Sequence, residues 1–577
     1  MSTKLSPQAN KLPDALAGAV KAAMDDWQSG DKVRRFWQHD ASLWTSTDEA
    51  NWMGWLDITA DQIAHSEKLR AAVAEVKKEN FTDILLLGMG GSSLCPDVLK
   101  VTFGKIAGFP ELHVLDSTDP AQIKAFENKV NLAKTLFIVS SKSGTTLEPN
   151  IFKQYFFERA KQTVGADKAG SRFIAITDPG SKMQQVAEAD RFRQVFFGLA
   201  SIGGRYSALS NFGLVPAGLM GLDLNRFLGR TQEMVEACGA GVSVEQNPGV
   251  HLGIVLGTAA RNGRDKLTII TSPGLSALGA WLEQLVAEST GKQGKGIVPV
   301  DREEPGVPEI YGTDRVFAYV RLSSDRDKAQ EAKIAALEQA GHPVVRIVVG
   351  DVYDLGQEFF RWEVATAIAG SIIGINPFNQ PDVEASKIAT RSLTTEYEKT
   401  GSLPAESPIL VDGGVKLFTD SRNDEALAKG AGSDKSLAGY LRAHINRAGA
   451  GDYFALLAYI QMNTEHETLL QGLRHALRNK KQVATCLEFG PRFLHSTGQA
   501  YKGGPNSGVI LQITCDDSAD LPVPGQTYTF GVVKAAQARG DFQVLVERGR
   551  RALRVHLGKD LASGLATLAA AFRQALR

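Results

Sequence analysis

The sequence of 577 residues has few cysteines and no long apolar run. Its four cysteines, Cys95, Cys238, Cys486 and Cys515, lie far apart, form no CxxC pair and have no histidines clustered around them. This spacing argues against a disulfide framework and against a zinc site, and it indicates reduced thiols inside a cell. The chain also lacks a transmembrane-length apolar stretch, and its N-terminal residues lack the apolar core of a signal peptide. We therefore expect a soluble cytoplasmic protein.

An excess of charge of either sign is also missing. Lys plus Arg and Asp plus Glu number 64 each, so the formal net charge is zero at pH 7. A chain without a net field is not drawn to nucleic acid or to an anionic membrane, and we expect neither partner. Any binding of an anion must come from a local arrangement of side chains.

The order of the expected elements indicates an α/β protein of several domains. Single cores rarely exceed about 250 to 300 residues, so a chain of 577 residues should form two or three domains. Residues 1–80 have apolar residues at helical spacing and predict a helical segment. Residues 81–240 and 241–395 each alternate apolar strands with helices, which is typical of a doubly wound parallel sheet. Residues 396–577 predict an additional α/β portion.

Specific elements are expected in residues 396–577. Helices are predicted at 437–448, 452–463 and 468–478, followed by strands in VATCLEF (483–489), GVILQIT (508–514) and FQVLVE (542–547). An Ala-rich helix is predicted to close the chain.

The turn after the apolar run Leu136 to Val139 consists mostly of hydroxyl residues. Ser141, Lys142, Ser143, Gly144, Thr145 and Thr146 stand where the next helix should begin. A helix N-terminus offers unpaired N–H groups and a partial positive charge, and the hydroxyls add further donors. The segment therefore predicts a phosphate-binding turn, and since it matches no Walker loop, a sugar phosphate fits better than a nucleotide triphosphate. A polar turn that only caps its helix is the simpler alternative.

A glycine-rich turn at Gly88 to Ser93 has two interpretations. It follows a strand, opens a helix and precedes Asp116 at the end of the next strand, as a dinucleotide-binding fingerprint does. However, Ser93 stands in place of the third glycine, and Ser92 adds a hydroxyl near the phosphate-binding turn. We favour a second wall of a sugar phosphate pocket and keep nicotinamide binding as the alternative.

Two further segments could carry reactive groups. Arg205 follows Gly203 and Gly204, and a guanidinium so placed could stabilise an oxyanion, although a surface Arg in a tight turn is the alternative. Gln284 and Glu288 are four residues apart and hence on one face of a helix. Glu288 could transfer a proton while Gln284 holds a substrate hydroxyl, whereas a solvated helix face is the default for such residues.

Two motifs resemble the signatures of the glucose-6-phosphate isomerase family. They are GGRYS at residues 203–207 and GSIIGINPFNQPDVEASK at residues 370–387, in the family's order. The resemblance implies two sugar-isomerase (SIS) domains and reversible conversion of glucose 6-phosphate to fructose 6-phosphate, in glycolysis and gluconeogenesis, without cofactor or metal. It implies phosphate binding by Ser141, Lys142, Ser143 and Thr146 with Ser92 nearby, a base in Glu288, an enediolate stabiliser in Arg205, and substrate contacts from Gly204, Gln284, Gln380 and Lys387.

The family's ring-opening histidine is best matched by His495, in the run GPRFLHSTGQAYKGGPNSG. In most of the family this segment precedes the lysine segment, whereas here it follows Lys387, which would assist ring opening. The order resembles the isomerase half of fused transaldolase and glucose-6-phosphate isomerase proteins. The resemblance also implies a homodimer in which the histidine reaches the partner's site. A sugar phosphate sensor without turnover and an NAD-dependent dehydrogenase are the alternatives.

Overall fold

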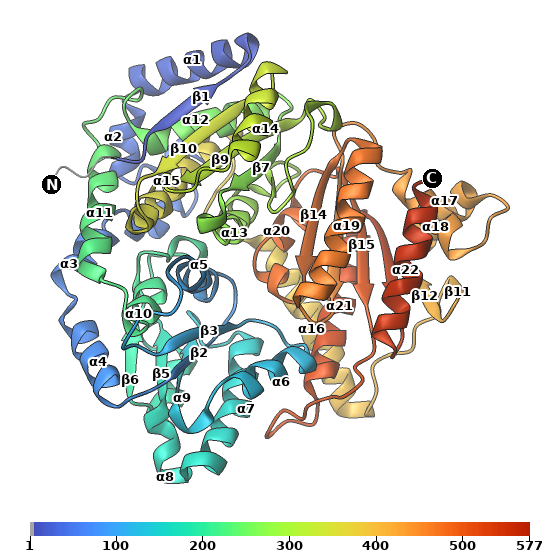
Figure 1. The fold of residues 1–577 in the computed structure, drawn as a ribbon, viewed down its shortest axis with the longest axis horizontal. Helices are drawn as coiled ribbons and strands as arrows, with labels where there is room; N and C mark the ends of the chain where they lie inside the picture. Colours follow the sequence, from blue (N-terminus) through green and yellow to red (C-terminus); the bar gives the residue numbers. More distant parts are fainter. Residues whose placement is uncertain (1–4) are drawn as a thin grey trace.

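Three β-sheets organise the computed structural model, which describes residues 5–577 (Figure 1). The first sheet is entirely parallel and has the order β3-β2-β4-β5-β6. Its strands are β2 (Asp83–Gly88), β3 (Glu111–Leu115), β4 (Thr135–Ser140), β5 (Phe173–Thr177) and β6 (Gln194–Phe197). Apolar side chains are buried on both faces of this sheet, so helices must cover both faces, as in a doubly wound fold.

The second sheet has the order β1-β10-β9-β7-β8. Its parallel strands are β7 (Lys266–Thr271), β8 (Val298–Val300), β9 (Arg315–Leu322) and β10 (Val344–Val349). The edge strand β1 (Gln8–Lys11) runs antiparallel to β10. Strand β1 corrects the prediction that residues 1–80 are only helical; residues 1–4 of that segment lie outside the described residues. A short edge strand of mixed polarity gives no strong periodic signal.

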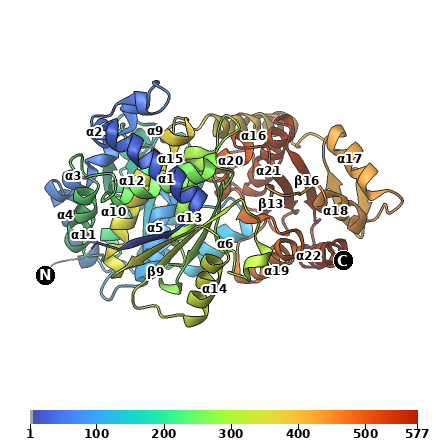
Figure 2. The ribbon, with the colours of Figure 1, turned by 90° about the horizontal axis from the view of Figure 1, so that it is seen from above.

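The third sheet, formed after residue 400, has the order β11-β12-β16-β15-β13-β14. Its strands are β11 (Leu410–Asp412), β12 (Val415–Phe418), β13 (Tyr453–Tyr459), β14 (Ala484–Phe489), β15 (Gly508–Thr514) and β16 (Arg551–His556). Strands β14, β13, β15 and β16 are parallel, whereas β12 and β11 are antiparallel additions at one edge. Figure 2 shows from a second direction that this portion lies beside the other two.

The three sheets share one strand order. Numbered along the chain, the parallel strands of each sheet lie in the order 2-1-3-4, and a fifth strand continues each sheet beyond the fourth. In such a sheet the chain leaves strand 1 towards strand 2 on one side and then returns to strand 3 on the other side of strand 1. The connections that follow strands 1 and 3 therefore diverge, and a crevice remains between the carboxyl ends of these two strands. The predicted α/β class is therefore confirmed. The chain contains a third unit of the same topology where the sequence indicated only an additional α/β portion.

Helices cover the sheets and connect the units. Those before the first sheet are α1 (Asp14–Ser29), α2 (Lys32–Trp37), α3 (Ile58–Ala64) and α4 (Glu67–Lys78). Those of the first unit are α5 (Leu94–Phe103), α6 (Pro120–Lys129), α7 (Leu147–Val164), α8 (Ala166–Ala169), α9 (Lys182–Ala189), α10 (Asn211–Leu219) and α11 (Leu224–Ala237). The second unit has α12 (Pro248–Arg261), α13 (Leu278–Thr290), α14 (Lys328–Gln339), α15 (Leu355–Ile373) and α16 (Pro381–Thr400). No helix in residues 5–577 combines the length and apolar character needed to cross a bilayer.

The third unit packs against the first through α21 (Phe530–Glu547). Its remaining helices are α17 (Ser421–Ala431), α18 (Leu437–Ile445), α19 (Thr464–Lys481), α20 (Gly498–Gly503) and α22 (Leu561–Ala575). Phe530 of α21 stacks on Phe152 of α7 at 6.2 Å between ring centroids. Figure 1 shows α16 and α21 between the first and third sheets, and α16 extends across the predicted domain boundary at residue 395.

Two predictions for the third unit are wrong. Residues 452–463 were expected to be helical, but they contain the central strand β13, because a continuous apolar run such as YFALLAY does not separate a buried strand from a buried helix. Residues 542–547 were expected to be a strand, but they end helix α21. Gly540 gives the impression of a helix break. The helix nevertheless continues through Gly540. An added Cβ there would be 2.9 Å from the backbone nitrogen of Thr390 in α16, so glycine allows the two helices to approach closely.

Three buried carboxyl groups lie where the second and third units meet. They belong to Glu283 of α13, Asp301 after β8 and Glu488 of β14, and Glu283 accepts a hydrogen bond from the Asp301 backbone N–H. Tyr501 donates a hydrogen bond to Glu488 at 3.2 Å. Burial raises the pKa of Glu488 from its usual 4.5 to about 7. This interface therefore keeps a proton that the unfolded chain would release.

The free energy of unfolding should consequently fall as pH rises from the usual pKa of Glu488, 4.5, to its raised value of about 7. Between the usual pKa of Glu488 and its raised value, the folded chain holds one proton more than the unfolded chain, which contributes a slope of up to about 1.4 kcal/mol per pH unit. Glu488→Gln should remove this slope, because glutamine does not titrate and still accepts from Tyr501. Urea unfolding at several pH values checks this, with the exposed Glu465→Gln as the control. Equal slopes in wild type and Glu488→Gln would contradict the assignment.

Candidate active site

The predicted phosphate-binding turn, residues 141–146, lies between β4 and α7, at the carboxyl edge of the first sheet. The Ser141 hydroxyl is buried and has no hydrogen-bond partner among the described residues. Thr146 occupies the N-cap position of α7, yet its side chain makes no capping hydrogen bond. The simpler interpretation as a helix cap therefore does not account for these hydroxyls, which leaves them available to an anion.

Gly144 and Lys142 have distinct positions in this turn. Gly144 has a φ of +68°, and an added Cβ would lie 2.3 Å from the Met183 nitrogen, so both its conformation and its surroundings require glycine. Lys142 was predicted to hold the phosphate with Ser143, but its ammonium group forms an ion pair with Asp178 in this structure. The Ser143 hydroxyl instead contacts the Thr145 hydroxyl at 2.9 Å within the turn.

The two glycine-rich turns pack against each other. An added Cβ on Gly91 would lie 2.0 Å from the carbonyl oxygen of Gly204, and one on Gly90 would lie 2.7 Å from the carbonyl oxygen of His495. The glycines after β2 therefore allow close packing of protein backbone. This arrangement explains them without a dinucleotide pyrophosphate, and it places the neighbouring Ser92 and the Arg205 turn together.

Arg205 is buried and connects two motifs that are far apart in the sequence. Its Nη1 donates to Gln380 Oε1 at 2.9 Å, and its Nε donates to the Ser289 hydroxyl at 2.9 Å. Its Nη1 also lies 3.4 Å from Glu288 Oε1. The alternative of a surface arginine is thus wrong: the guanidinium faces the carboxylate of Glu288 in the interior.

Glu288 lies in the last turn of α13 and is buried as well. Gln284, one turn earlier, donates from Nε2 to Glu288 Oε2 at 2.9 Å and to the backbone oxygen of His495 at 2.8 Å. The spacing of four residues correctly predicted a shared face, and that face points into the protein. One amide group therefore connects the proposed base to the histidine segment of the third unit.

His495 forms a buried contact that the sequence did not indicate. Its Nε2 lies 2.8 Å from Glu148 Oε1, in the first turn of α7. Gln537 of α21 donates to the same oxygen at 2.6 Å and accepts from the Thr118 hydroxyl at 2.7 Å. Burial would raise the pKa of Glu148, but the charge of His495 and its hydrogen bond hold the pKa below its usual value. The position of Glu148 directly after the phosphate-binding turn was the signal that could have identified it.

Lys292 is a second residue that sequence reasoning missed. Its buried ammonium donates to the backbone oxygen of Asn376 at 2.8 Å and to Asn379 Oδ1 at 3.0 Å. Burial and the neighbouring Arg205 charge lower the pKa of Lys292 well below its usual value. Lys292 thereby holds the segment that presents Gln380 to Arg205. Its place four residues after Glu288, at the end of α13, was the only clue in the sequence.

A cavity of about 620 Å³ opens between the first unit and α16. The predicted residues Thr146, Lys387 and His495 line it together with Glu148 and Gln537. Lys387 is about half exposed and lies 3.5 Å from Glu384 on the same helix. The cavity therefore joins the phosphate-binding turn, the lysine of α16 and the histidine, although these come from three separate units.

The structure thus brings many of the predicted residues together in two connected groups, whereas Ser92, Ser141, Lys142 and Ser143 neither line the cavity nor contact Glu288. One group surrounds Glu288 and contains Arg205, Gln284 and Gln380; the other lines the cavity. Gln284 connects them through the His495 backbone. Within residues 5–577, no group of three or more His, Cys, Asp or Glu side chains is arranged to hold a metal ion.

Known proteins similar to this chain are named for the family whose signatures the two sequence motifs resemble. Residues 47–304 match the family described as phosphoglucose isomerase. The glucose-6-phosphate isomerase of Prochlorococcus marinus (strain NATL2A) is 28% identical over 466 residues, which cover 72% of this chain and 84% of that protein. The glucose-6-phosphate isomerase of Rubrobacter xylanophilus is 28% identical over 376 residues, covering 56% of this chain and 85% of that protein.

Solved structures support the fold. A hypothetical protein from Thermus thermophilus aligns with a TM-score of 0.57 and 24% identity, covering 67% of this chain and 99% of that one. A glucose-6-phosphate isomerase from Chlamydia trachomatis aligns with a TM-score of 0.54 and 20% identity, covering 65% of this chain and 86% of that one. At these identities the likeness establishes a shared fold.

The contact between Glu148 and His495 should stabilise the docking of the third unit. Glu148→Gln should lower the free energy of unfolding at neutral pH by about 1 to 3 kcal/mol, since a buried charge-assisted hydrogen bond is weakened. Because the pKa of Glu148 is lowered by folding, its contribution is present above the usual carboxyl pKa and is lost as pH falls below it. The difference between variant and wild type should therefore shrink in acid.

Denaturant unfolding at neutral and acidic pH measures this difference. Glu158→Gln, on the same helix but about 41% exposed, is the matched control and should change stability by less than about 0.5 kcal/mol. A Glu148→Gln variant as stable as this control at neutral pH would show that the contact contributes nothing.

Proposed function

We propose that this chain, a relative of the phosphoglucose isomerases over residues 47–304, interconverts glucose 6-phosphate and fructose 6-phosphate. The observation that carries the proposal is the buried pair of Arg205 and Glu288, whose closest atoms are 3.4 Å apart, beside Gln284 and the histidine segment. An aldose-to-ketose conversion needs a base for a carbon-bound proton and a cation for the resulting oxyanion. This pair supplies both.

Glu288 is assigned the proton transfer. Its carboxylate would take the proton from C2 of the open sugar and return it to C1 through a cis-enediol. Arg205 would face the negative charge that develops on the enediolate oxygens, and Gln284 and Gln380 would hold substrate hydroxyls. Arg205 suits this role because four of its contacts are to neutral oxygen acceptors, which fix the guanidinium while leaving its charge uncompensated except by Glu288.

His495 and Lys387 are assigned the opening of the pyranose ring. Both line the cavity, and His495 is oriented by Glu148 at 2.8 Å. His495, held by the carboxylate, could donate a proton to the ring oxygen as O1 loses its own. The phosphate group would bind at Ser141, Ser143 and Thr146 beside Ser92, with the backbone of Lys142 and Gly204 close to the sugar.

We propose that one chain contains every residue of its active site, without a residue from a partner subunit. The expected sharing of a histidine between subunits is not needed, because His495 of the third unit lies beside Gln284 and Glu148 of the same chain. A homodimer stays a prediction, and so does a place in the cytoplasm, in glycolysis and gluconeogenesis. The third unit would supply in one chain the histidine that the family resemblance assigns to a partner.

Replacing the proposed base tests the reaction. Glu288→Gln should lower kcat for fructose 6-phosphate by at least about 10² to 10⁴, because glutamine cannot take up the C2 proton, while the Kd for the sugar phosphate changes only a few-fold. A coupled dehydrogenase assay and calorimetry measure the two quantities. The exposed Glu465→Gln serves as control.

The outcomes separate the alternatives. Wild-type turnover that Glu288→Gln abolishes supports the isomerase. Binding without wild-type turnover would instead indicate a sugar phosphate sensor, and stabilisation by NAD would indicate a dehydrogenase. An equal loss of binding and turnover in Glu288→Gln would contradict the role given to this carboxylate.

Mixing two inactive variants tests the origin of the histidine. Glu288→Gln and His495→Asn chains, co-expressed in equal amounts, should recover no activity if each site is built from one chain. A site shared across a dimer would instead recover about a quarter of the wild-type activity, since half of the dimers would be mixed and each of these would hold one intact site. Size-exclusion chromatography of the co-expressed sample confirms whether mixed dimers form, and wild type diluted in parallel shows whether a single chain is active.

A further inference from the structure

The third unit has a second cavity, which shares no lining residue with the cavity of the candidate active site. It measures about 280 Å³ and lies at the carboxyl ends of β15 and β16, beside α21. Its lining includes Thr514, Lys416, Arg539 and Arg554. The carboxyl ends of parallel strands are where sheets of this type bind ligands.

Two arginines in this cavity converge on a single carboxylate oxygen. Arg539 Nε lies 2.8 Å from Glu406 Oε2, and Arg554 Nη2 lies 2.7 Å from the same oxygen. The side chain of Arg554 is only 4% exposed, and its guanidinium lies 4.5 Å from the centre of the Phe418 ring. A buried guanidinium that lies over an aromatic ring suits anion binding, because burial and the ring restrict its side chain and its planar fork offers several donors.

The carboxylate that fills this receptor comes from a segment without regular structure. Residues 401–409, which join α16 to β11, contain no helix or strand and are largely exposed. Arg539 also donates a hydrogen bond to the Pro404 carbonyl oxygen of this segment. Glu406 therefore belongs to a connecting segment with few other contacts, and its side chain can leave the cavity without disturbing a sheet or a helix.

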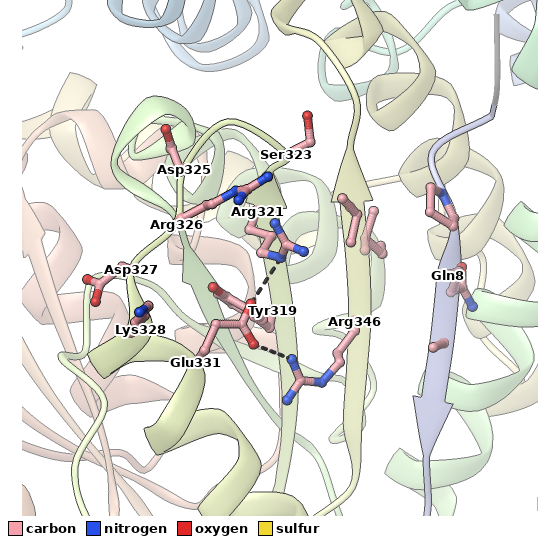
Figure 3. Close-up of a pocket in the computed structure, with 14 residues that line it drawn as sticks. Gln8, Tyr319, Arg321, Ser323, Asp325, Arg326, Asp327, Lys328, Glu331 and Arg346 are labelled. Carbon is pink, nitrogen blue, oxygen red and sulfur yellow. Dashed lines mark hydrogen bonds and ion pairs between the residues drawn. The ribbon is translucent and has the colours of Figure 1, made fainter.

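The second sheet provides a comparison at the corresponding position. Figure 3 shows its cavity beside α14, over β9 and β10, where Glu331 binds Arg321 at 3.0 Å and Arg346 at 2.7 Å. Glu331 belongs to α14, and Glu338 of the same helix also binds Arg346. Here displacement of Glu331 would leave Arg346 paired with Glu338 and would free only Arg321, so no pair of guanidinium groups becomes available to an anion.

The other charges around the third-unit cavity do not replace Glu406. Lys534 is already paired with Asp119 and Asp517. Asp516, which is 62% exposed, lies 3.4 Å from His556. Without Glu406, both guanidinium groups would be left with no carboxylate within ion-pair distance among the described residues.

We propose that this cavity is a second ligand site, which binds a small phosphate-bearing molecule in competition with Glu406. A phosphate group carries about 1.5 to 2 negative charges near neutral pH and presents several acceptor oxygens, whereas the Glu406 carboxylate carries one charge. Two converging guanidinium groups are thus better neutralised by phosphate than by their present partner. This site is independent of the proposed isomerase activity.

Titration calorimetry with inorganic phosphate, at constant ionic strength, tests the proposal. Glu406→Gln removes the internal competitor and should raise phosphate affinity at this site at least about tenfold over wild type. Adding Arg554→Met to Glu406→Gln should abolish the gain. The phosphate-binding turn of the first unit is intact in all these proteins, so the comparison isolates the third-unit cavity. Acetate in place of phosphate should show a much smaller gain.

Two further variants keep the result interpretable. Arg539→Gln in the Glu406→Gln background, at a less buried position, should also lose the gain and covers the case in which Arg554→Met does not fold. Glu331→Gln, the matched change on the second sheet, should leave phosphate affinity unchanged. The proposal is overturned if Glu406→Gln binds phosphate no better than wild type, or if the gain survives loss of either arginine. It is also overturned if acetate binds as well as phosphate, since that result would assign the cavity to carboxylates.

Discussion

The contact between His495 and Glu148 is the interaction on which the arrangement of this site depends. It joins the first turn of α7, directly after the phosphate-binding turn, to the third unit, and Gln284 secures the backbone of the same histidine from the second unit. Three units therefore meet at one residue. Glu148 and Gln284 are buried, so packing fixes their geometry. A displaced third unit would remove the His495 and Gln537 partners of Glu148 and would leave Gln284 with Glu288 alone.

The 2-1-3-4 strand order, which all three sheets share, explains why the cavities lie at the carboxyl ends of the strands. Each sheet has a cavity near the carboxyl ends of its strands, and the side chains in the three cavities differ. In the first, the hydroxyl turn faces the cavity that His495 and Lys387 also line. In the second, a helix neutralises the arginines, and in the third, the carboxylate of a connecting segment occupies them. Topology supplies the crevice, while local side chains decide what it binds.

Sequence patterns predicted the first two units well and the third less well. Strands β2, β4 and β5 of the first unit contain apolar runs, and small or polar residues end or follow them, so the strands and the carboxyl edge of the sheet were evident. The third unit contains a central strand whose continuous apolar run could equally be a buried helix, and a long helix that continues through Gly540. In both cases the deciding information is a neighbour distant in sequence: β15 for the strand and α16 for the helix.

The sequence by itself determined the α/β class, because strands and helices alternate along the chain. Short motifs and local spacing also predicted the phosphate-binding turn and the roles of Glu288, Arg205, Gln284 and His495, which stay predictions. Tertiary structure alone decided that Arg205 faces Glu288, that Lys142 turns to Asp178, and that Glu148 holds His495 within the same chain. The physical reason is that pairing of charges depends on which side chains are buried together. Burial brings together residues hundreds of positions apart, and a linear pattern contains no record of those distances.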